Sequence, residues 1–241
     1  MSRWSGVALL LLALPAWSVP AEPAPALVLV AASLAPAVEA ALRLPGAPRA
    51  TVSVAGTGEL VRQVRAGARA DLLFAADEAS VQQLAGEGKV RASRAVLSNR
   101  LAVVVPASSP ARGDARGVLG EARRIGLADP AAVPAGRYAR AWLERVGLWA
   151  SVQGRVVPLL DARACFAAVA AGRVDAAVVY ATDARRPGVR VVAEVPTSEG
   201  PAIRHVLARL SERAEAKAVE AFLLGAAAER TYVEAGYGVV E

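Results

Sequence analysis

Five short segments of this chain carry neutral hydrogen-bond donors at points where helices are expected to begin. The clearest is 28–34, a β-rich run that ends in the hydroxyl of Ser33 just where an amphipathic helix begins. The first backbone N–H groups of a helix have no partner inside it and lie at the positive end of its dipole. Several such ends directed at one point would form an anion site without a cation. The other four segments are 55–59, 129–136, 160–163 and 178–181.

Each segment also has an ordinary structural interpretation. Ser33 and Asp161 could be N-caps, and Pro134 could be the first residue of a helix. The glycines of 55–59 are typical of turns, because glycine tolerates positive φ, and Tyr180 could simply be an aromatic residue at a strand end. The combination of all five segments, rather than any one of them, indicates a binding site.

Residues suited to catalysis or to metal binding are scarce. His205 is the single histidine, and no Gly-x-Ser-x-Gly motif accompanies it, so we expect a surface or structurally bonded side chain rather than a catalytic base. No Cys-x-x-Cys pair or His-carboxylate cluster is spaced for zinc, and no Gly-Lys-Ser/Thr phosphate loop is present. We therefore predict that the protein is not an enzyme and has no catalytic residue, no cofactor and no free metal cation.

Composition narrows the class of protein further. The chain has 241 residues, enough for one large domain or two lobes, and 55% of them are hydrophobic. Its formal charge is +6, but the arginines are scattered, so we expect a solvated basic surface and no nucleic-acid partner. Cys165 is the single cysteine, which excludes an internal disulfide, and we expect it to be a small core residue on a helix face.

The N-terminus has the pattern of a secretory signal, which we assign to residues 1–21. Arg3 supplies the positive charge, 7–17 the apolar stretch and 19–21 the small-residue cleavage site, although cleavage after Ser18 fits the same rule. The apolar stretch is shorter than the roughly 20 residues that span a bilayer, and an N-terminal anchor is the alternative. Export of a chain without disulfides predicts a periplasmic protein.

Beyond the leader, strand and helix patterns alternate, with a loop rich in Pro, Ser and Gly at 106–117. This alternation predicts two α/β lobes built on mostly parallel sheets flanked by helices, with the ligand cleft between the lobes at the carboxyl ends of the strands. We place lobe 1 at 26–103 with 199–241, and lobe 2 at 104–198. The expected strands are 27–31, 50–55, 70–75, 100–105, 124–128, 155–159, 176–180 and 189–195, and the expected helices 34–43, 59–66, 78–87, 136–146, 162–171, 211–224 and 226–235.

In their amino-acid sequences and in their order along the chain, the five segments resemble those of the periplasmic molybdate-binding proteins of ABC uptake systems. The resemblance covers essentially the whole chain after the leader. It implies a type II periplasmic-binding fold with crossing strands and a tetrahedral oxyanion in the cleft. The motifs that carry it are Ala-Ala-Ser-Leu at 31–34, Ala-Gly-Thr-Gly-Glu at 55–59, Val-Pro-Ala-Gly at 133–136, Asp-Ala-Arg at 161–163 and Val-Val-Tyr-Ala-Thr-Asp-Ala at 178–184.

The resemblance also implies a role for one residue in each segment. Ser33 and Thr57 would donate hydroxyl and backbone hydrogen bonds from the first lobe. Ala135 and Ala162 would donate backbone N–H groups from helix starts in the second lobe, and Tyr180 its phenol. The sequence departs from the family around Thr57, where two glycines replace neighbouring serines, so the donor set at that turn stays open.

The expected function is therefore capture of molybdate, and of tungstate as well, for delivery to an inner-membrane ABC permease by a monomeric protein. Molybdenum would be held as the oxyanion by the five donor residues, and a shell without acceptors would penalise protonated phosphate. The alternatives are a tungstate- or sulfate-selective protein of the same fold, an exported hydrolase that uses a Ser or Asp in the cleft, and the effector domain of a DNA-binding regulator.

Overall fold

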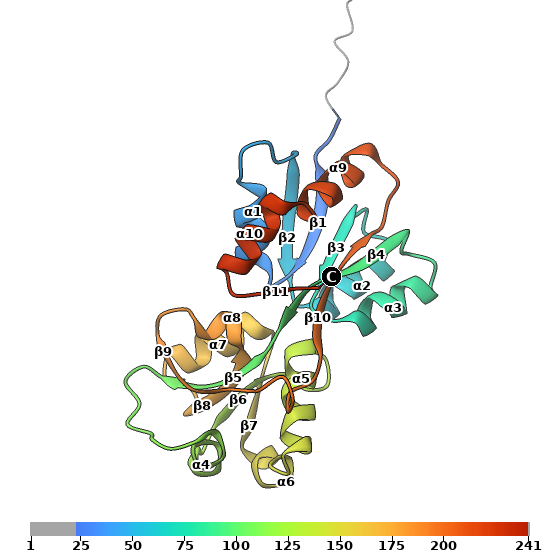
Figure 1. Cartoon of the computed structure of the whole chain (residues 1–241). Coiled ribbons are helices and arrows are strands. Elements are labelled where there is room, and N and C mark those ends of the chain that lie inside the picture. The colour runs from blue at the N-terminus through green and yellow to red at the C-terminus, as the bar shows by residue number, and fades with distance from the viewer. Residues whose placement is uncertain (1–22, 241) are drawn as a thin grey trace, which may run out of the picture.

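The computed structural model describes residues 23–240, which form two α/β lobes (Figure 1). Each lobe is built on one β-sheet, with helices packed against both faces. This confirms the predicted two-lobed α/β architecture. The predicted signal segment lies outside the described residues.

Lobe 1 contains the six-stranded sheet, with strand order β11-β4-β10-β3-β1-β2. Its strands are β1 (Ala26–Ala31), β2 (Ala50–Ala55), β3 (Leu72–Ala75), β4 (Ala92–Asn99), β10 (Ile203–Arg209) and β11 (Gly238–Val239). Its helices are α1 (Ala35–Leu42), α2 (Thr57–Arg65), α3 (Glu78–Gly86), α9 (Ala214–Leu223) and α10 (Ala226–Glu234).

The apolar strands of lobe 1 are buried on both faces of the sheet. Val28 and Phe74 pack with α1, α9 and α10 on one face. Leu29 and Leu73, one residue away in each strand, pack with α2 and α3 on the other. Successive side chains of a strand point to opposite faces, so a continuous apolar run fills both layers. Figure 1 shows α1 and α10 on the left of this sheet and α2 and α3 on its right.

Lobe 2 contains the five-stranded sheet, with strand order β7-β6-β8-β5-β9. Its strands are β5 (Leu101–Pro106), β6 (Ile125–Ala128), β7 (Val156–Leu159), β8 (Ala176–Tyr180) and β9 (Val189–Glu194). Its helices are α4 (Ala115–Glu121), α5 (Pro134–Arg145), α6 (Trp149–Val152), the 3-10 turn η1 (Gln153–Arg155), α7 (Ala162–Ala170) and α8 (Ala181–Ala184). The helices α4, α5 and α6 pack on one face, and α7 and α8 on the other.

The chain crosses between the lobes twice, from β4 to β5 through Arg100 and from β9 to β10. The βα units pair in parallel, as β1–β2, β1–β3, β6–β7 and β6–β8, whereas the crossing strands pair antiparallel with their neighbours. The two sheets are therefore mixed. Since β5 starts at Leu101, the lobe boundary predicted between 103 and 104 falls inside this strand.

Seven observed elements are absent from those predicted, namely β4, β10, β11, α4, α6, η1 and α8. The strands β4 and β10 interrupt their apolar residues with arginine and other polar residues, so neither has the continuous apolar run or the regular alternation that predicts a strand. The helix α4 falls at the end of the expected loop, where two glycines among its seven residues weaken the helical pattern. Its start is fixed by Asp114, whose side chain accepts a hydrogen bond from the N–H of Gly117.

Candidate functional site

The five residues predicted to bind the anion line one small cavity between the lobes. Its volume is about 10 Å³. Of the described residues that line it, none is Arg or Lys. Lobe 1 contributes Ala31, Ala32, Ser33, Gly56, Thr57 and Ala76, and lobe 2 contributes Val133, Pro134, Ala135, Asp161, Ala162 and Tyr180.

Ser33 lies in the turn between β1 and α1 and is buried. The N-cap position of α1 is Leu34 and carries no side-chain cap, so the capping role considered for Ser33 is wrong. The carbonyl of Ser33 accepts a 2.7 Å hydrogen bond from the phenol of Tyr237. This bond, from the far end of the chain, holds the turn in place and leaves the Ser33 hydroxyl available to a ligand.

Thr57 is the first residue of α2 and is also buried. Its Oγ1 accepts a 3.1 Å hydrogen bond from the backbone N–H of Ala76. A threonine hydroxyl has one proton to donate, so this accepted bond orients the oxygen and leaves the proton for a ligand. The turn thus keeps a donor although the neighbouring residues Gly56 and Gly58 carry no hydroxyl.

Ala135 and Ala162 lie at the starts of α5 and α7. The first N–H of α5 with an acceptor in its own helix belongs to Arg137, and the first in α7 to Cys165. The N–H groups of Ala135 and Ala162 precede these bonds, so each is one of the unpaired donors of a helix N-terminus. The ordinary structural roles considered for the neighbouring residues are also observed. Pro134 is the first residue of α5, and Asp161 caps α7 because its side chain accepts a hydrogen bond from the N–H of Ala164.

Gly136 explains how the start of α5 reaches the cavity. A Cβ built on this residue would lie 2.0 Å from the carbonyl oxygen of Ala128, the last residue of β6. Only a residue without a side chain allows this helix to approach the strand end so closely. The glycine of the Val-Pro-Ala-Gly motif thereby places the N–H of Ala135 at the cleft.

Tyr180 ends β8 and is fully buried. Its phenol oxygen has no hydrogen-bond partner among residues 23–240. Burial, with smaller contributions from Tyr138 and Asp77, raises the pKa of this phenol well above its ordinary value of 10, so it keeps its proton. A buried donor without a partner is costly, and a ligand oxygen in the adjoining cavity would satisfy it.

His205 of β10 supports the site from behind. Its ring makes edge-to-face contacts with Tyr180 and Tyr237, at 5.6 Å between centroids in each case. Its Nδ1 lies 3.2 Å from the carbonyl oxygen of Ala76, so Nδ1 carries the proton and donates it. Burial is the main reason that the pKa of His205 falls to about 4, and the ring is neutral at pH 7. This confirms a structurally bonded histidine.

Residues Tyr237 and His205 therefore position the binding turns without lining the cavity, and neither was among the predicted site residues.

Cys165 is buried in α7, as predicted, and burial raises the pKa of its thiol to about 12. Within the described part of the chain, no group of three or more His, Cys, Asp or Glu side chains could hold a metal ion. No helix between 23 and 240 is long and apolar enough to cross a membrane.

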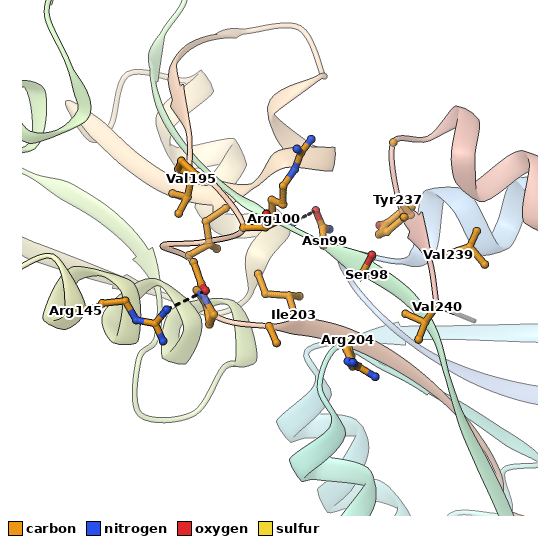
Figure 2. Close-up of a pocket in the computed structure, with 18 residues that line it drawn as sticks. Ser98, Asn99, Arg100, Arg145, Val195, Ile203, Arg204, Tyr237, Val239 and Val240 are labelled. Atoms are coloured by element: carbon orange, nitrogen blue, oxygen red, sulfur yellow. Dashed lines mark hydrogen bonds between the residues drawn. The ribbon is translucent and has the colours of Figure 1, made fainter.

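A larger cavity of about 880 Å³ lies on the crossing segments (Figure 2). Arg100, Arg145 and Arg204 line it. Two of these side chains already have partners, because Arg100 pairs with Glu194 at 2.9 Å and Arg145 donates to the carbonyl oxygens of Glu199 and Gly200. The cleft, whose described lining includes Asp161 but no Arg or Lys, and this basic cavity are thus chemically distinct.

A cleft of neutral donors between two α/β lobes is the arrangement of a protein that binds a small solute. The chain belongs to the family of bacterial extracellular solute-binding proteins, whose family model matches residues 26–238. The resemblance identified from the binding segments is thereby confirmed.

Named relatives and solved structures agree with this family. The chain is 35% identical over 130 residues to YvgL of Bacillus subtilis (strain 168), assigned by its name to an ABC transporter as a substrate-binding lipoprotein; the match covers 53% of this chain and 50% of YvgL. It is 29% identical to the molybdate-binding protein ModA of Escherichia coli (strain K12), over 78% of this chain and 77% of ModA.

The periplasmic molybdate-binding protein of Azotobacter vinelandii has a similar solved structure. It superimposes with a TM-score of 0.78 at 20% identity, over 90% of this chain and 100% of that protein. At this identity the likeness concerns the fold, and it extends over both lobes.

Proposed function

We propose that this protein captures molybdate, and tungstate as well, in the cleft between the lobes and delivers it to an inner-membrane ABC permease. The observation that carries the proposal is the phenol of Tyr180, which has no hydrogen-bond partner among residues 23–240, in a cavity that gathers donors from both lobes and whose described lining contains no Arg or Lys. The names of the relatives that match most of the chain support molybdate as the anion.

The donor set suits a dianion. Hydrogen bonds to a charged acceptor contribute about 1.5–3 kcal/mol each, so five to seven of them can hold a doubly charged ion without a counter-ion. Protonated phosphate carries an O–H that needs an acceptor, whereas a fully ionised oxyanion can accept from every donor described above. We further propose that the size of the cleft separates molybdate and tungstate from the smaller sulfate.

A hydrolytic role is not favoured, because the single histidine is fully buried, with Nδ1 already donating to Ala76. We propose that the protein is not an enzyme and needs no cofactor. We also propose that it is a periplasmic monomer, on the strength of the leader pattern and of the family to which it belongs.

Isothermal titration calorimetry of the exported form with sodium molybdate, tungstate, sulfate and phosphate tests the proposal. We expect saturable heat with molybdate and tungstate, and none with phosphate. Heat with sulfate and none with molybdate would instead support the sulfate-selective alternative. No heat with either molybdate or tungstate would contradict the proposal.

A further inference from the structure

An ion pair joins the two lobes beside the cavity. Asp77 of lobe 1 follows Ala76 and caps α3, its Oδ1 accepting a 2.6 Å hydrogen bond from the N–H of Ser80. Its other oxygen accepts from the guanidinium of Arg137, which lies on α5 in lobe 2. The carboxylate is almost fully buried, with 5% of the side chain exposed, whereas the Arg137 side chain is 41% exposed.

The two ends of this pair belong to elements that also form the cavity. Ala76 lines it and donates to Thr57, and Arg137 is two residues after Ala135 on the same helix. The lobes also touch nearby, since a Cβ built on Gly58 would lie 3.2 Å from the carbonyl oxygen of Ala132. The ion pair therefore spans the cleft at the point where the lobes close.

The charge of Asp77 would oppose an anion unless it is neutralised. The described lining of the cavity includes the carboxylate of Asp161 and no Arg or Lys, and the Asp77 carboxylate is close enough to contribute, after burial, to the raised pKa of Tyr180. A buried carboxylate without its cation repels a second negative charge strongly, because the surroundings screen it little. Arg137 reaches this carboxylate from the opposite lobe.

We infer that Arg137 sets the affinity of the anion site without lining it, by bridging to Asp77 when the lobes close. It is a positioning residue with two effects, since it holds α5 against lobe 1 and cancels the charge that would repel the bound dianion. Closure and anion binding then favour each other. This inference rests on the proposed function, because the charge effect requires an anionic ligand.

Arg137→Gln is the direct test, and Arg140→Gln is its matched control. Arg140 lies one turn further along α5 and pairs with Glu144 of the same helix, so its substitution removes the same charge without breaking a bridge between lobes. With molybdate or tungstate as the probe, we expect Arg137→Gln to weaken binding about tenfold or more, mainly through faster dissociation. Arg140→Gln should leave the affinity within about twofold.

The double variant Asp77→Asn with Arg137→Gln separates a charge effect from damage to the fold. Asparagine caps a helix as well as aspartate does, so α3 keeps its cap. Removing the unpaired carboxylate should restore part of the affinity lost in Arg137→Gln. Equal affinities of Arg137→Gln and Arg140→Gln would overturn the inference, as would an affinity of the double variant no better than that of Arg137→Gln.

A failure of the proposed function gives a different result. If the unaltered protein binds neither molybdate nor tungstate, the proposed function is wrong. The inference that Arg137 neutralises Asp77 in favour of a bound anion is then wrong as well. The bridge itself is then tested by small-angle X-ray scattering without ligand. A larger radius of gyration for Arg137→Gln than for Arg140→Gln supports an interlobe bridge, and equal radii contradict it.

Discussion

At the scale of single residues, the site contrasts polar groups that are already paired with polar groups that are not. The Thr57 oxygen and the Ser33 carbonyl each accept a hydrogen bond from the protein, which fixes their turns. The Tyr180 phenol is equally buried but has no partner among the described residues. Burying the Tyr180 hydroxyl without a hydrogen-bond partner destabilises the protein, and a hydrogen bond to a ligand oxygen would remove this destabilisation.

Tyr180→Phe should weaken binding of molybdate about tenfold to a hundredfold, because one hydrogen bond to a charged acceptor contributes about 1.5–3 kcal/mol. The free energy of unfolding should not fall, since the phenol has no partner to lose in the part of the chain that the structure describes. Tyr232→Phe is the matched control: its buried phenol donates to the Leu223 carbonyl, away from the cleft. Calorimetry and urea unfolding should show that this variant loses stability and keeps its affinity. An unchanged affinity in Tyr180→Phe would contradict the role of the phenol.

Thr57→Val should weaken the anion complex and also destabilise the fold, by about 1–3 kcal/mol, because the buried N–H of Ala76 loses its acceptor. Thr57→Ser keeps the hydroxyl and should retain both properties to within a few-fold in affinity. Calorimetry and chemical denaturation of the pair measure the two effects. Equal binding by the Val and Ser variants would show that the hydroxyl does not contact the ligand.

The sequence was sufficient to place the five predicted donors in one cavity, because each follows a strand or opens a helix and such ends meet at one edge of a sheet. It did not reveal Tyr237 and His205 as supports. Both act through contacts more than 100 residues apart in the chain, 204 for Tyr237 with Ser33 and 129 for His205 with Ala76. No local pattern records such contacts.

At the scale of elements, the position of a helix start is as important as the residues on it. The N-terminus of α5 reaches the cavity because Gly136 lets it rest on the end of β6. The helices α2 and α7 begin directly after loops that line the same cavity. Helix ends supply donors whose direction is set by packing rather than by flexible side chains.

Gly136→Ala should destabilise the protein by about 1–3 kcal/mol or more, because its Cβ would meet the Ala128 backbone and displace α5. Binding should weaken as well, since the Ala135 donor moves with the helix. Gly120→Ala in α4 is the control, because a Cβ there meets nothing within 4 Å. Alanine in that helix should instead stabilise by about 0.5–1 kcal/mol. Thermal unfolding with calorimetric titration distinguishes the two, and equal stabilities would contradict the packing argument.

Two of the elements that the sequence did not predict, β4 and β10, lie where the chain crosses between the lobes. The regular βα units have continuous apolar strands and could be recognised. The strands β4 and β10 are stabilised by pairing with each other over seven residue pairs, a non-local interaction that no local pattern predicts. Their antiparallel pairing, with that of β5 and β9, is also why the sheets are mixed rather than nearly all parallel.

At the scale of the whole molecule, two buried titratable groups act in opposite directions on stability. His205 has a folded-state pKa of about 4, below its ordinary 6.5, so its contribution is complete above pH 6.5 and is lost as the pH falls towards 4. Burial raises the pKa of Asp183 from 3.8 to about 7, so its contribution is complete below pH 3.8 and is lost as the pH rises towards 7. Between about pH 4 and 6.5 the two slopes oppose each other.

Asp183→Asn should therefore make the free energy of unfolding rise more steeply with pH between 4 and 6.5, since the contribution of His205 is then no longer opposed by that of Asp183. At pH 7 the variant should be more stable by roughly 1–3 kcal/mol, because the protein no longer buries a carboxylate with an unpartnered oxygen. Urea unfolding at intervals of half a pH unit measures both effects. Parallel pH profiles for the two proteins would contradict the prediction.

We propose that a tetrahedral oxyanion binds in the cleft between the lobes. A crystal structure of the protein with tungstate tests this proposal, because tungsten gives a strong anomalous signal. We expect one dominant peak between the lobes, with the tungstate oxygens within hydrogen-bond distance of Ser33, Thr57 and Tyr180. If the cleft contains no peak and the anomalous signal lies instead among the arginines of the cavity on the crossing segments, the proposed anion site is wrong.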